Sequence, residues 1–311
     1  MNISVILCTY NRCQRLSKAL ASVAASVMPA SATWEVLVID NNSKDQTREV
    51  IEDFCGRYPG RFRYMLETKQ GKSFALNTAL KNAQGDILAF MDDDVVVEPM
   101  WLQNLVAPLN DKQWAGTGGR IRPDWSAPPP PWLPLDGPHN LGGMLALFDQ
   151  GDEAAALEQP PFGTNMAFRR SVFERYGEFR TDFGPIPGSE IRNEDTEFGR
   201  RVMAAGERLR YEPSAVVYHL IPENRLKREY FLAFWFDHGV ATVREDAGKK
   251  PNIFGIPRRY FSVVKAGGQL AARTLQWGLA WEPQLRFYRK GWVWMTAGEF
   301  SEYWRQSVKA K

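Results

Sequence analysis

Three adjacent carboxylates, Asp92, Asp93 and Asp94, have the residue types and spacing best suited to chemistry in this sequence. They follow an apolar run at 86–91 that predicts a buried strand. Adjacent carboxylates repel one another unless a cation neutralises them, and hard oxygen ligands favour Mg²⁺ or Mn²⁺, usually together with phosphate oxygens. Side chains alternate along an extended chain, so Asp92 and Asp94 should point the same way and Asp93 the opposite way. The motif predicts a divalent cation at a strand exit; an acidic turn is the alternative.

Polar side chains also follow two earlier predicted strands, at 2–8 and 35–40. The residues at these two strand ends are Thr9, Tyr10, Asn11, Asp40 and Asn42. A carboxylate such as Asp40 can accept hydrogen bonds from a base or a ribose. The alternative is turn chemistry, with Ser43 as a good N-cap for the next helix.

The elements that must position these clusters alternate between strand and helix. Leu16, Leu20, Val23 and Val27 recur at the spacing of one helix face, and continuous apolar strands flank that helix. Such alternation predicts an α/β fold with a parallel sheet, whose ligands lie beyond the carboxyl ends of the strands. The proline-rich stretch at 123–138 predicts a long surface loop.

Lys72 lies in a GKS sequence that resembles part of a phosphate-binding loop. The full pattern needs a glycine five residues before Gly71, where this chain has Leu66, so a P-loop is excluded. Lys72 could still meet a phosphate at the start of its helix. A solvated lysine is the alternative.

Two further motifs have both a chemical and a structural interpretation. Glu194 and Asp195 precede an amphipathic helix, where they could supply a general base or could only stabilise the helix start. His219 ends an apolar strand at 211–219, and it could complete a divalent metal site or be structural.

The C-terminal region is basic and rich in tryptophan. The 311-residue chain has a net charge of +3, yet residues 251–311 contain six Arg, four Lys and three Glu, a net +7. The tryptophans concerned are Trp277, Trp281, Trp292, Trp294 and Trp304. Two roles are possible for this region: contact with a membrane interface that carries anionic headgroups, or a helical cap whose tryptophans pack on the core. No run of about 18 apolar residues exists, so we expect no spanning helix, and the basic residues match no nucleic-acid module.

Five segments together resemble the family 2 glycosyltransferases of the GT-A fold, over a stretch from Ile3 to Gly239. They are Ser4–Arg12, Glu35–Thr47, Phe90–Val95, Gly163–Arg170 and Asn193–Arg201. The resemblance implies a Rossmann-like, mixed but mostly parallel sheet flanked by helices, with a basic helical C-terminal extension. It implies a catalytic domain at 1–225, with a nucleotide-sugar half at 1–115 and an acceptor half at 116–225, followed by the helical region at 226–311.

The resemblance also implies a role for each matching residue. Thr9, Tyr10 and Asn11 would border the nucleoside, Asp40 would take the base edge, and Asn42 would lie close by. Asp92 would lie near ribose and metal, with Asp93 and Lys72 also at the donor, and Asp94 would bind the cation. Asp195 would be the base, with Glu194 beside it, and His219 would contact metal or diphosphate. The residues expected around the donor sugar and acceptor are Gly163, Thr164, Asn165 and Arg225.

The implied activity is a Mg²⁺- or Mn²⁺-dependent, inverting transfer from a nucleotide sugar, most often UDP-linked, to a hydroxyl group. The acceptor would be a glycan or a lipid-linked molecule in bacterial polysaccharide or glycan synthesis. The Q-x-x-R-W motif of processive members is missing, which favours single addition. The expected location is the cytoplasm, with peripheral contact to the inner membrane left open. A loop at 125–141 or 184–193 could close over the donor. The alternatives are a sugar-nucleotide nucleotidyltransferase and a non-catalytic nucleotide- or carbohydrate-binding module.

Overall fold

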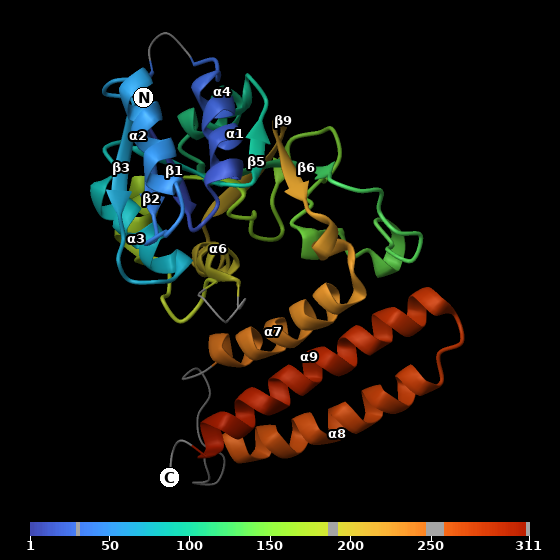
Figure 1. Ribbon diagram of the computed structural model, residues 1–311. Coiled ribbons are helices and arrows are strands. Elements are labelled where there is room, and N and C mark those ends of the chain that lie inside the picture. Colours follow the sequence, from blue (N-terminus) through green and yellow to red (C-terminus); the bar gives the residue numbers. More distant parts are fainter. Residues whose placement is uncertain (29–31, 186–191, 247–257, 309–311) are drawn as a thin grey trace. The chain divides into compact units, whose positions relative to one another are not determined.

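The computed structural model describes residues 1–28, 32–185, 192–246 and 258–308. Its first elements are β1 (Asn2–Thr9), α1 (Cys13–Ala24), β2 (Thr33–Asp40), α2 (Thr47–Arg57), β3 (Phe62–Leu66), α3 (Lys72–Asn82) and β4 (Ile87–Asp92). There follow β5 (Val95–Val97), α4 (Trp101–Val106), β6 (Trp114–Trp125), β7 (Ala155–Ala156), β8 (Asn165–Arg169), α5 (Arg170–Tyr176), α6 (Glu194–Ala204) and β9 (Arg208–Ile221). The last helices are α7 (Arg228–Asp246), α8 (Arg258–Gly278) and α9 (Pro283–Val308) (Figure 1).

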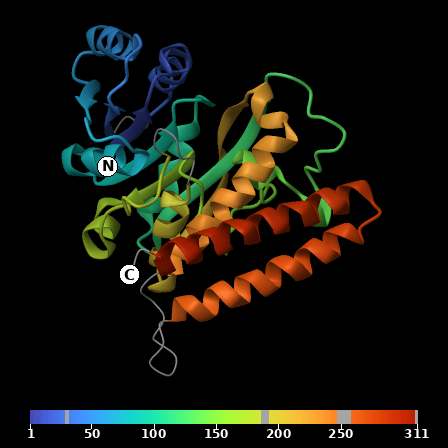
Figure 2. The ribbon, with the colours of Figure 1, turned by 60° about the horizontal axis from the view of Figure 1, so that its bottom comes forward.

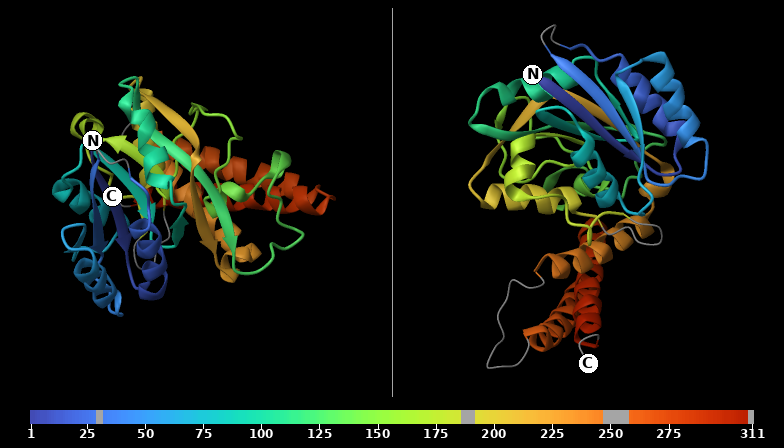
Figure 3. Two further views of the ribbon diagram at one scale, coloured as in Figure 1. Left: turned by 90° about the horizontal axis from the view of Figure 1, so that it is seen from above. Right: turned by 90° about the vertical axis from the view of Figure 1, so that its left-hand side faces the viewer.

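The strands form a mixed sheet in the order β3-β2-β1-β4-β8-β6-β9-β5, with β7 added beside β9. The pairs among β3, β2, β1 and β4 are parallel, whereas β8 runs antiparallel to β4. The long strands β6 and β9 lie side by side in Figure 3 (left). The predicted α/β sheet flanked by helices is confirmed, and the parallel part is the part that the alternating pattern covers.

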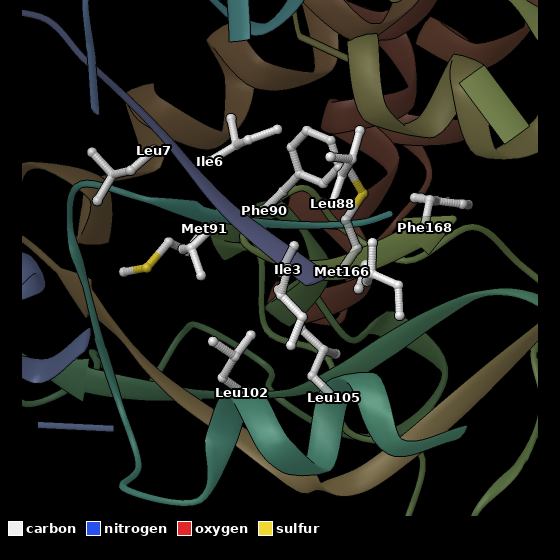
Figure 4. Packing of buried hydrophobic residues seen from close by; sticks show 14 of the residues in the cluster. Ile3, Ile6, Leu7, Leu88, Phe90, Met91, Leu102, Leu105, Met166 and Phe168 are labelled. Carbon is white, nitrogen blue, oxygen red and sulfur yellow. The ribbon is translucent and has the colours of Figure 1, made fainter. Parts of the chain in front are cut away.

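Apolar side chains on the central strands form the core, because these strands are covered on both faces. Figure 4 shows Ile3 and Ile6 of β1 near Leu88 and Phe90 of β4, with the adjoining α4 side chains pointing toward them. All of these side chains are buried. Burial of each such side chain stabilises the fold by about 1.5–3 kcal/mol.

Several local predictions differ from the structure. The helix after β2 begins at Thr47 rather than beside Ser43, so Ser43 is not its N-cap. Strand β6 includes Pro123, which was predicted to lie in a loop, because the strand pairing continues to Trp125. Part of the second predicted mobile loop, residues 186–191, lies outside the described residues.

Two compact units are distinguished within the chain. The first contains residues 1–124, 146–187 and 194–220, and the second contains 125–145, 188–193 and 221–311. The segment 125–145 therefore groups with the C-terminal helices instead of with the sheet. The predicted division into a nucleotide-sugar half and an acceptor half stays a prediction.

In the second unit, α9 lies between α7 and α8 (Figures 1 and 2). Close packing of α7 on α9 depends on glycines: a Cβ atom added at Gly239 would lie 2.0 Å from the carbonyl oxygen of Met295, and one at Gly298 would lie 2.1 Å from that of Phe236. The predicted helical C-terminal extension is confirmed. No helix in the described ranges is long and apolar enough to cross a bilayer.

Candidate active site

The polar strand ends of the first unit meet at one edge of the sheet. In the parallel register Thr9 at the end of β1 pairs with Asp40 at the end of β2, and Cys8 pairs with Asp92 at the end of β4. The three predicted polar clusters are therefore neighbours, although 84 residues separate the linked pair Thr9 and Asp93. This is the carboxyl edge at which α/β sheets bind their ligands.

The three carboxylates of the acidic triplet do not all have the same partners. Asp92 accepts hydrogen bonds from Lys72 Nζ and Thr164 Oγ1, each at 2.7 Å. Asp93 accepts one from Thr9 Oγ1 at 2.7 Å. The predicted strict alternation is wrong, because β4 ends at Asp92 and the chain turns before β5, so Asp93 and Asp94 share a partner.

That shared partner is Arg12, which sequence reasoning missed. Its Nη1 lies 2.8 Å from Asp93 Oδ1 and 3.1 Å from Asp94 Oδ2. Burial raises the pKa of Asp93 to about 6, although Arg12 opposes this shift. Adjacent carboxylates need a neutralising cation. The basic residue Arg12 lies three residues beyond the end of β1, and this position could have indicated from the sequence that it is the cation.

Asp94 and His219 are adjacent. The buried Nε2 of His219 lies 3.5 Å from Asp94 Oδ1, because Val95, the first residue of β5, pairs with His219 in β9. Asp92 instead faces Lys72 and Thr164, so the three predicted metal ligands do not converge. Among the described residues, no group of three or more His, Cys, Asp or Glu side chains is arranged to hold a metal ion.

The donor chemistry of Asp94 and His219 nevertheless fits a divalent cation that arrives with a substrate. Mg²⁺ is usually held by one or two carboxylates together with substrate phosphates, not by a full protein cage. A carboxylate oxygen and an imidazole nitrogen are both suitable donors, and the remaining positions would be filled by phosphate oxygens. These two residues can thus provide the protein's share of such a site.

Lys72 bridges two carboxylates from distant parts of the chain. Besides Asp92, its Nζ lies 3.3 Å from Glu194 Oε1 at the start of α6. Burial favours the neutral amine, but Asp92 and Glu194 outweigh it and raise the pKa of Lys72 above its ordinary value. Burial raises the pKa of Glu194, and its Oε2 is buried with no hydrogen-bond partner in the structure.

Asp195 is held from two sides. Its Oδ2 accepts a hydrogen bond from the Gly163 backbone N–H at 2.5 Å, and its Oδ1 accepts one from the Thr196 backbone N–H at 2.7 Å. A Cβ atom at Gly163 would lie 3.0 Å from Oδ2, so the approach depends on glycine.

A pocket opens beside Asp195. Its lining residues are Cys8, Lys72, Leu76, Phe90, Met91, Asp92, Gly163, Met166, Glu194 and Asp195. Burial strongly raises the pKa of the Cys8 thiol, so this cysteine is protonated and is not a nucleophile. The structure therefore brings the predicted base pair, Glu194 and Asp195, together with Asp92 and Lys72.

Asp40 closes the other end of the site edge. Its Oδ1 accepts the Ser43 backbone N–H at 2.8 Å, and its Oδ2 accepts the Tyr64 hydroxyl at 3.3 Å. Asn42 accepts a hydrogen bond from Lys44 and has a φ of +67°, which Asn tolerates in turns. Tyr10 and Asn11, which follow β1, are both exposed, and Tyr10 is 37% exposed. The Asn11 backbone N–H donates to Ser43 Oγ, and Asn11 Oδ1 accepts the Lys44 backbone N–H.

One predicted residue of the first unit, Asn165, points away from the pocket into the core. Asn165 is fully buried, and its amide bonds Trp101 Nε1 and the carbonyl oxygens of Arg120 and Ala215. It points to the core because β8 alternates its side chains, so its predicted contact with sugar is wrong. Arg225 belongs to the second unit, and its role stays a prediction.

Comparisons with known proteins identify the family of this chain. The sequence profile of "Glycosyl transferase family 2" matches residues 4–177. The succinoglycan biosynthesis protein ExoM of Rhizobium meliloti is 29% identical over 270 residues, which are 86% of this chain and 82% of that protein. A glucosyl-dolichyl phosphate glucuronosyltransferase of Haloferax volcanii is 27% identical over 245 residues, 76% of this chain and 75% of that protein.

Solved structures show the same fold. A mannosyltransferase, PcManGT from Pyrobaculum calidifontis, solved in complex with GDP-Man and Mn²⁺, aligns with a TM-score of 0.62 at 20% identity and covers 99% of this chain and 87% of that one. S. aureus TarS 1-349 in complex with UDP aligns with a TM-score of 0.54 at 15% identity over 99% of this chain and 92% of that one. With the family profile spanning more than half of its residues, this chain belongs to glycosyltransferase family 2 and is a glycosyltransferase of the GT-A fold.

Proposed function

We propose that this glycosyltransferase moves a sugar from a UDP-linked donor to a hydroxyl group, with Mg²⁺ or Mn²⁺ at the diphosphate and with inversion at the anomeric carbon. The acceptor class is a glycan or a lipid-linked saccharide. The observation that carries the proposal is the continuous polar edge from Asp40 through the acidic triplet to Asp195 in the first unit.

Hydrogen bonds and ion pairs link the central part of this edge in two groups, which meet at the adjacent residues Asp92 and Asp93. Thr9, at the end of β1, bonds Asp93, and Arg12 joins Asp93 to Asp94. Lys72 joins Asp92 to Glu194, the residue before Asp195. One ligand lying along the edge could therefore contact all of these residues. A nucleoside diphosphate sugar is long enough and polar enough to do so.

The position of the pocket suggests how the donor is divided. Asp92, Gly163 and Asp195 line it, so it is the place we assign to the transferred sugar. The nucleoside would then lie along the ends of β1 and β2, with Asp40 at the base. We accordingly assign residues 1–115 to donor binding and 116–225 to the acceptor side.

The protein's share of the cation site is Asp94 and His219, with Asp92 close to the ribose. Bound there, Mg²⁺ or Mn²⁺ would neutralise the negative charge that develops on the departing diphosphate. Lys72 and Arg12 place two further positive charges among the carboxylates of the same edge. They would hold those carboxylates in position before the donor binds.

Asp195 is the proposed base. Its two oxygens each accept a backbone N–H, which orients the carboxylate and leaves lone pairs free for the acceptor proton. The acceptor oxygen would form a bond to the anomeric carbon while that carbon's bond to the β-phosphate oxygen breaks. The proton would pass to Asp195 and the bonding electrons to UDP. One displacement of this kind inverts the anomeric centre.

The relatives support the donor and acceptor classes without fixing either. One neighbouring structure holds GDP-Man with Mn²⁺ and another holds UDP. The similar curated proteins are named for succinoglycan biosynthesis and for a dolichyl phosphate-linked acceptor. A carboxylate at the base position, here Asp40, can accept the ring N–H of uracil, which cytosine lacks.

A thermal-shift panel of nucleotide sugars with Mn²⁺ tests the proposal. A donor that binds the folded state raises the unfolding midpoint by mass action, and we expect UDP-sugars to do so more than GDP-sugars. The same donors should release UDP when acceptor is added. Release of pyrophosphate from a nucleoside triphosphate would favour a nucleotidyltransferase, and binding without turnover would favour a non-catalytic module.

A further inference from the structure

The outer face of α8 is apolar and exposed. Residues 264, 268, 271, 275 and 279 follow one another at spacings of four, three, four and four, which aligns them on one side of the helix and its end. They are Val264, Gly268, Ala271, Leu275 and Leu279, all exposed. Val264 is 76% exposed, Leu275 66% and Leu279 63%. Exposed large apolar side chains gathered on one face indicate an interaction surface.

The turn between α8 and α9 continues this face. Trp281 is 93% exposed there, the most exposed large apolar side chain of the described residues. The opposite side of α8 is packed: Ala266 is buried, and a Cβ atom at Gly267 would lie 3.6 Å from the Phe300 ring. The apolar face is thus left over after α8 has packed on α9.

The tryptophans of the C-terminal region fall into two groups. Trp277 lies under Lys290 Nζ, at 5.9 Å from the ring centroid, and Trp292 lies under the Arg273 guanidinium at 4.7 Å. Both are half-buried between α8 and α9 and serve packing. Trp281 makes no such contact among the described rings and cations, so the two interpretations of this region apply to different residues.

Basic residues lie on the two helices that carry the apolar face and its turn. Arg286 on α9 is exposed, and Arg289 Nη1 donates to the Gln276 carbonyl oxygen at 2.8 Å, which holds its charge near the turn. Lys265 on α8 is also exposed, and it opposes the rise that burial causes in the pKa of Glu299 on α9. The nearby Glu282 is used locally, because its Oε2 accepts the Leu285 backbone N–H at the start of α9. Apolar and aromatic side chains bordered by Lys and Arg are the pattern of a surface that binds anionic headgroups.

We propose that the outer face of α8 and the α8–α9 turn dock on a membrane surface that carries anionic lipids, with Leu275, Leu279 and Trp281 in the interface. A second copy of the chain is disfavoured as the occupant, because twofold pairing of this face would bring its cations together. Docking of this kind does not depend on the donor chemistry of the first unit. It would keep the enzyme at the surface where lipid-linked acceptors are found.

Vesicle flotation tests the proposal with the full chain. We expect the protein to float with phosphatidylcholine vesicles that contain phosphatidylglycerol, not with phosphatidylcholine alone, and to float less at high salt. The variant L275S/L279S/W281S should lose flotation while its circular dichroism and unfolding midpoint match the wild type. The variant K265Q/R286Q should bind roughly 30-fold more weakly at low salt, since each basic residue near the surface contributes about fivefold.

Trp304→Ser is the matched control, because Trp304 is 57% exposed but lies near the opposite end of α9. It should float like the wild type. Absence of wild-type flotation, or equal flotation of the triple variant, would overturn the proposal. Light scattering that shows a wild-type dimer and a monomeric triple variant, without flotation, would also overturn it and assign the face to a second copy.

Discussion

Lys72 Nζ lies 2.7 Å from Asp92 Oδ1, and this ion pair joins the start of α3 to the end of β4. Lys72 is also 3.3 Å from Glu194, so a single ammonium group balances two carboxylates that are 102 residues apart in the chain (194 − 92). All three side chains are less than about one-third exposed, at 26%, 23% and 4%. The pairing fixes the wall of the pocket before any substrate is present.

Replacement of Lys72 by Met should lower the free energy of unfolding by about 3 kcal/mol, because it leaves two poorly solvated carboxylates without a counter-charge. Chemical denaturation measures the change. The control is Lys81→Met on the same helix: Lys81 pairs with Glu178 at 3.5 Å at the surface and should change stability by about 0.5 kcal/mol or less. The double variant K72M/E194Q should recover part of the loss. Equal effects of K72M and K81M would contradict the bridging role.

Asp195→Asn should reduce kcat by about 10²–10⁴-fold and leave UDP-sugar affinity within a few-fold of the wild type. The amide still accepts a hydrogen bond from Gly163 but cannot take the acceptor proton. Glu194→Gln is the matched comparison, since Glu194 is adjacent but paired with Lys72. Single-turnover assays with calorimetric donor binding separate the two effects. If Glu194→Gln removed turnover and Asp195→Asn did not, the two roles would have to be exchanged.

Glu194 should make stability depend on pH. Burial raises its pKa above the ordinary 4.5, so the native state binds a proton more readily than the unfolded chain. Its contribution to stability is therefore full below pH 4.5 and is lost as the pH rises through the higher native value. Glu194→Gln, which resembles the protonated form, should gain stability relative to the wild type from about pH 4.5 toward neutrality. Unfolding midpoints across that range test this, and a constant difference would contradict it.

Asp40→Asn should alter base selection. The amide oxygen can still accept the Ser43 backbone N–H, but the charge is lost, so UDP affinity should fall about tenfold. Binding of CDP should fall less, because the cytosine ring nitrogen is an acceptor that the Asn amide can meet. Calorimetry with both nucleotides gives the ratio. Equal losses for UDP and CDP would remove Asp40 from the base site.

The sequence predicted the parallel half of the sheet well, because local signals specify it. Apolar runs that end in polar clusters marked β1, β2 and β4, and parallel pairing alone brings their ends together. The antiparallel half was harder to predict: β6 contains Pro123, and β8 is only five residues long. The side chains of β8 alternate between the core and the pocket, and Asn165 is on the core side. A shift of one residue in the expected alternation is enough to place a side chain on the wrong side.

The partners of the carboxylates could not be predicted for a different reason. Arg12, Lys72 and Tyr64 reach Asp93, Asp92 and Asp40 across 81, 20 and 24 residues of chain. Side-chain pairing over such separations depends on tertiary packing, which periodicity does not encode. The turn after Asp92 likewise replaced the extended geometry on which the alternation argument relied.

The central claim is that Asp94, on the edge shared with Asp40 and Asp195, helps to hold a divalent cation against the donor diphosphate. Calorimetric titration of UDP with and without Mn²⁺ tests it directly on the wild type and Asp94→Ala. Asp86→Ala is the control, because Asp86 precedes β4 whereas Asp94 follows it. The account predicts Mn²⁺-dependent UDP binding by the wild type and Asp86→Ala, and none by Asp94→Ala. Unchanged Mn²⁺-dependent binding by Asp94→Ala would contradict it.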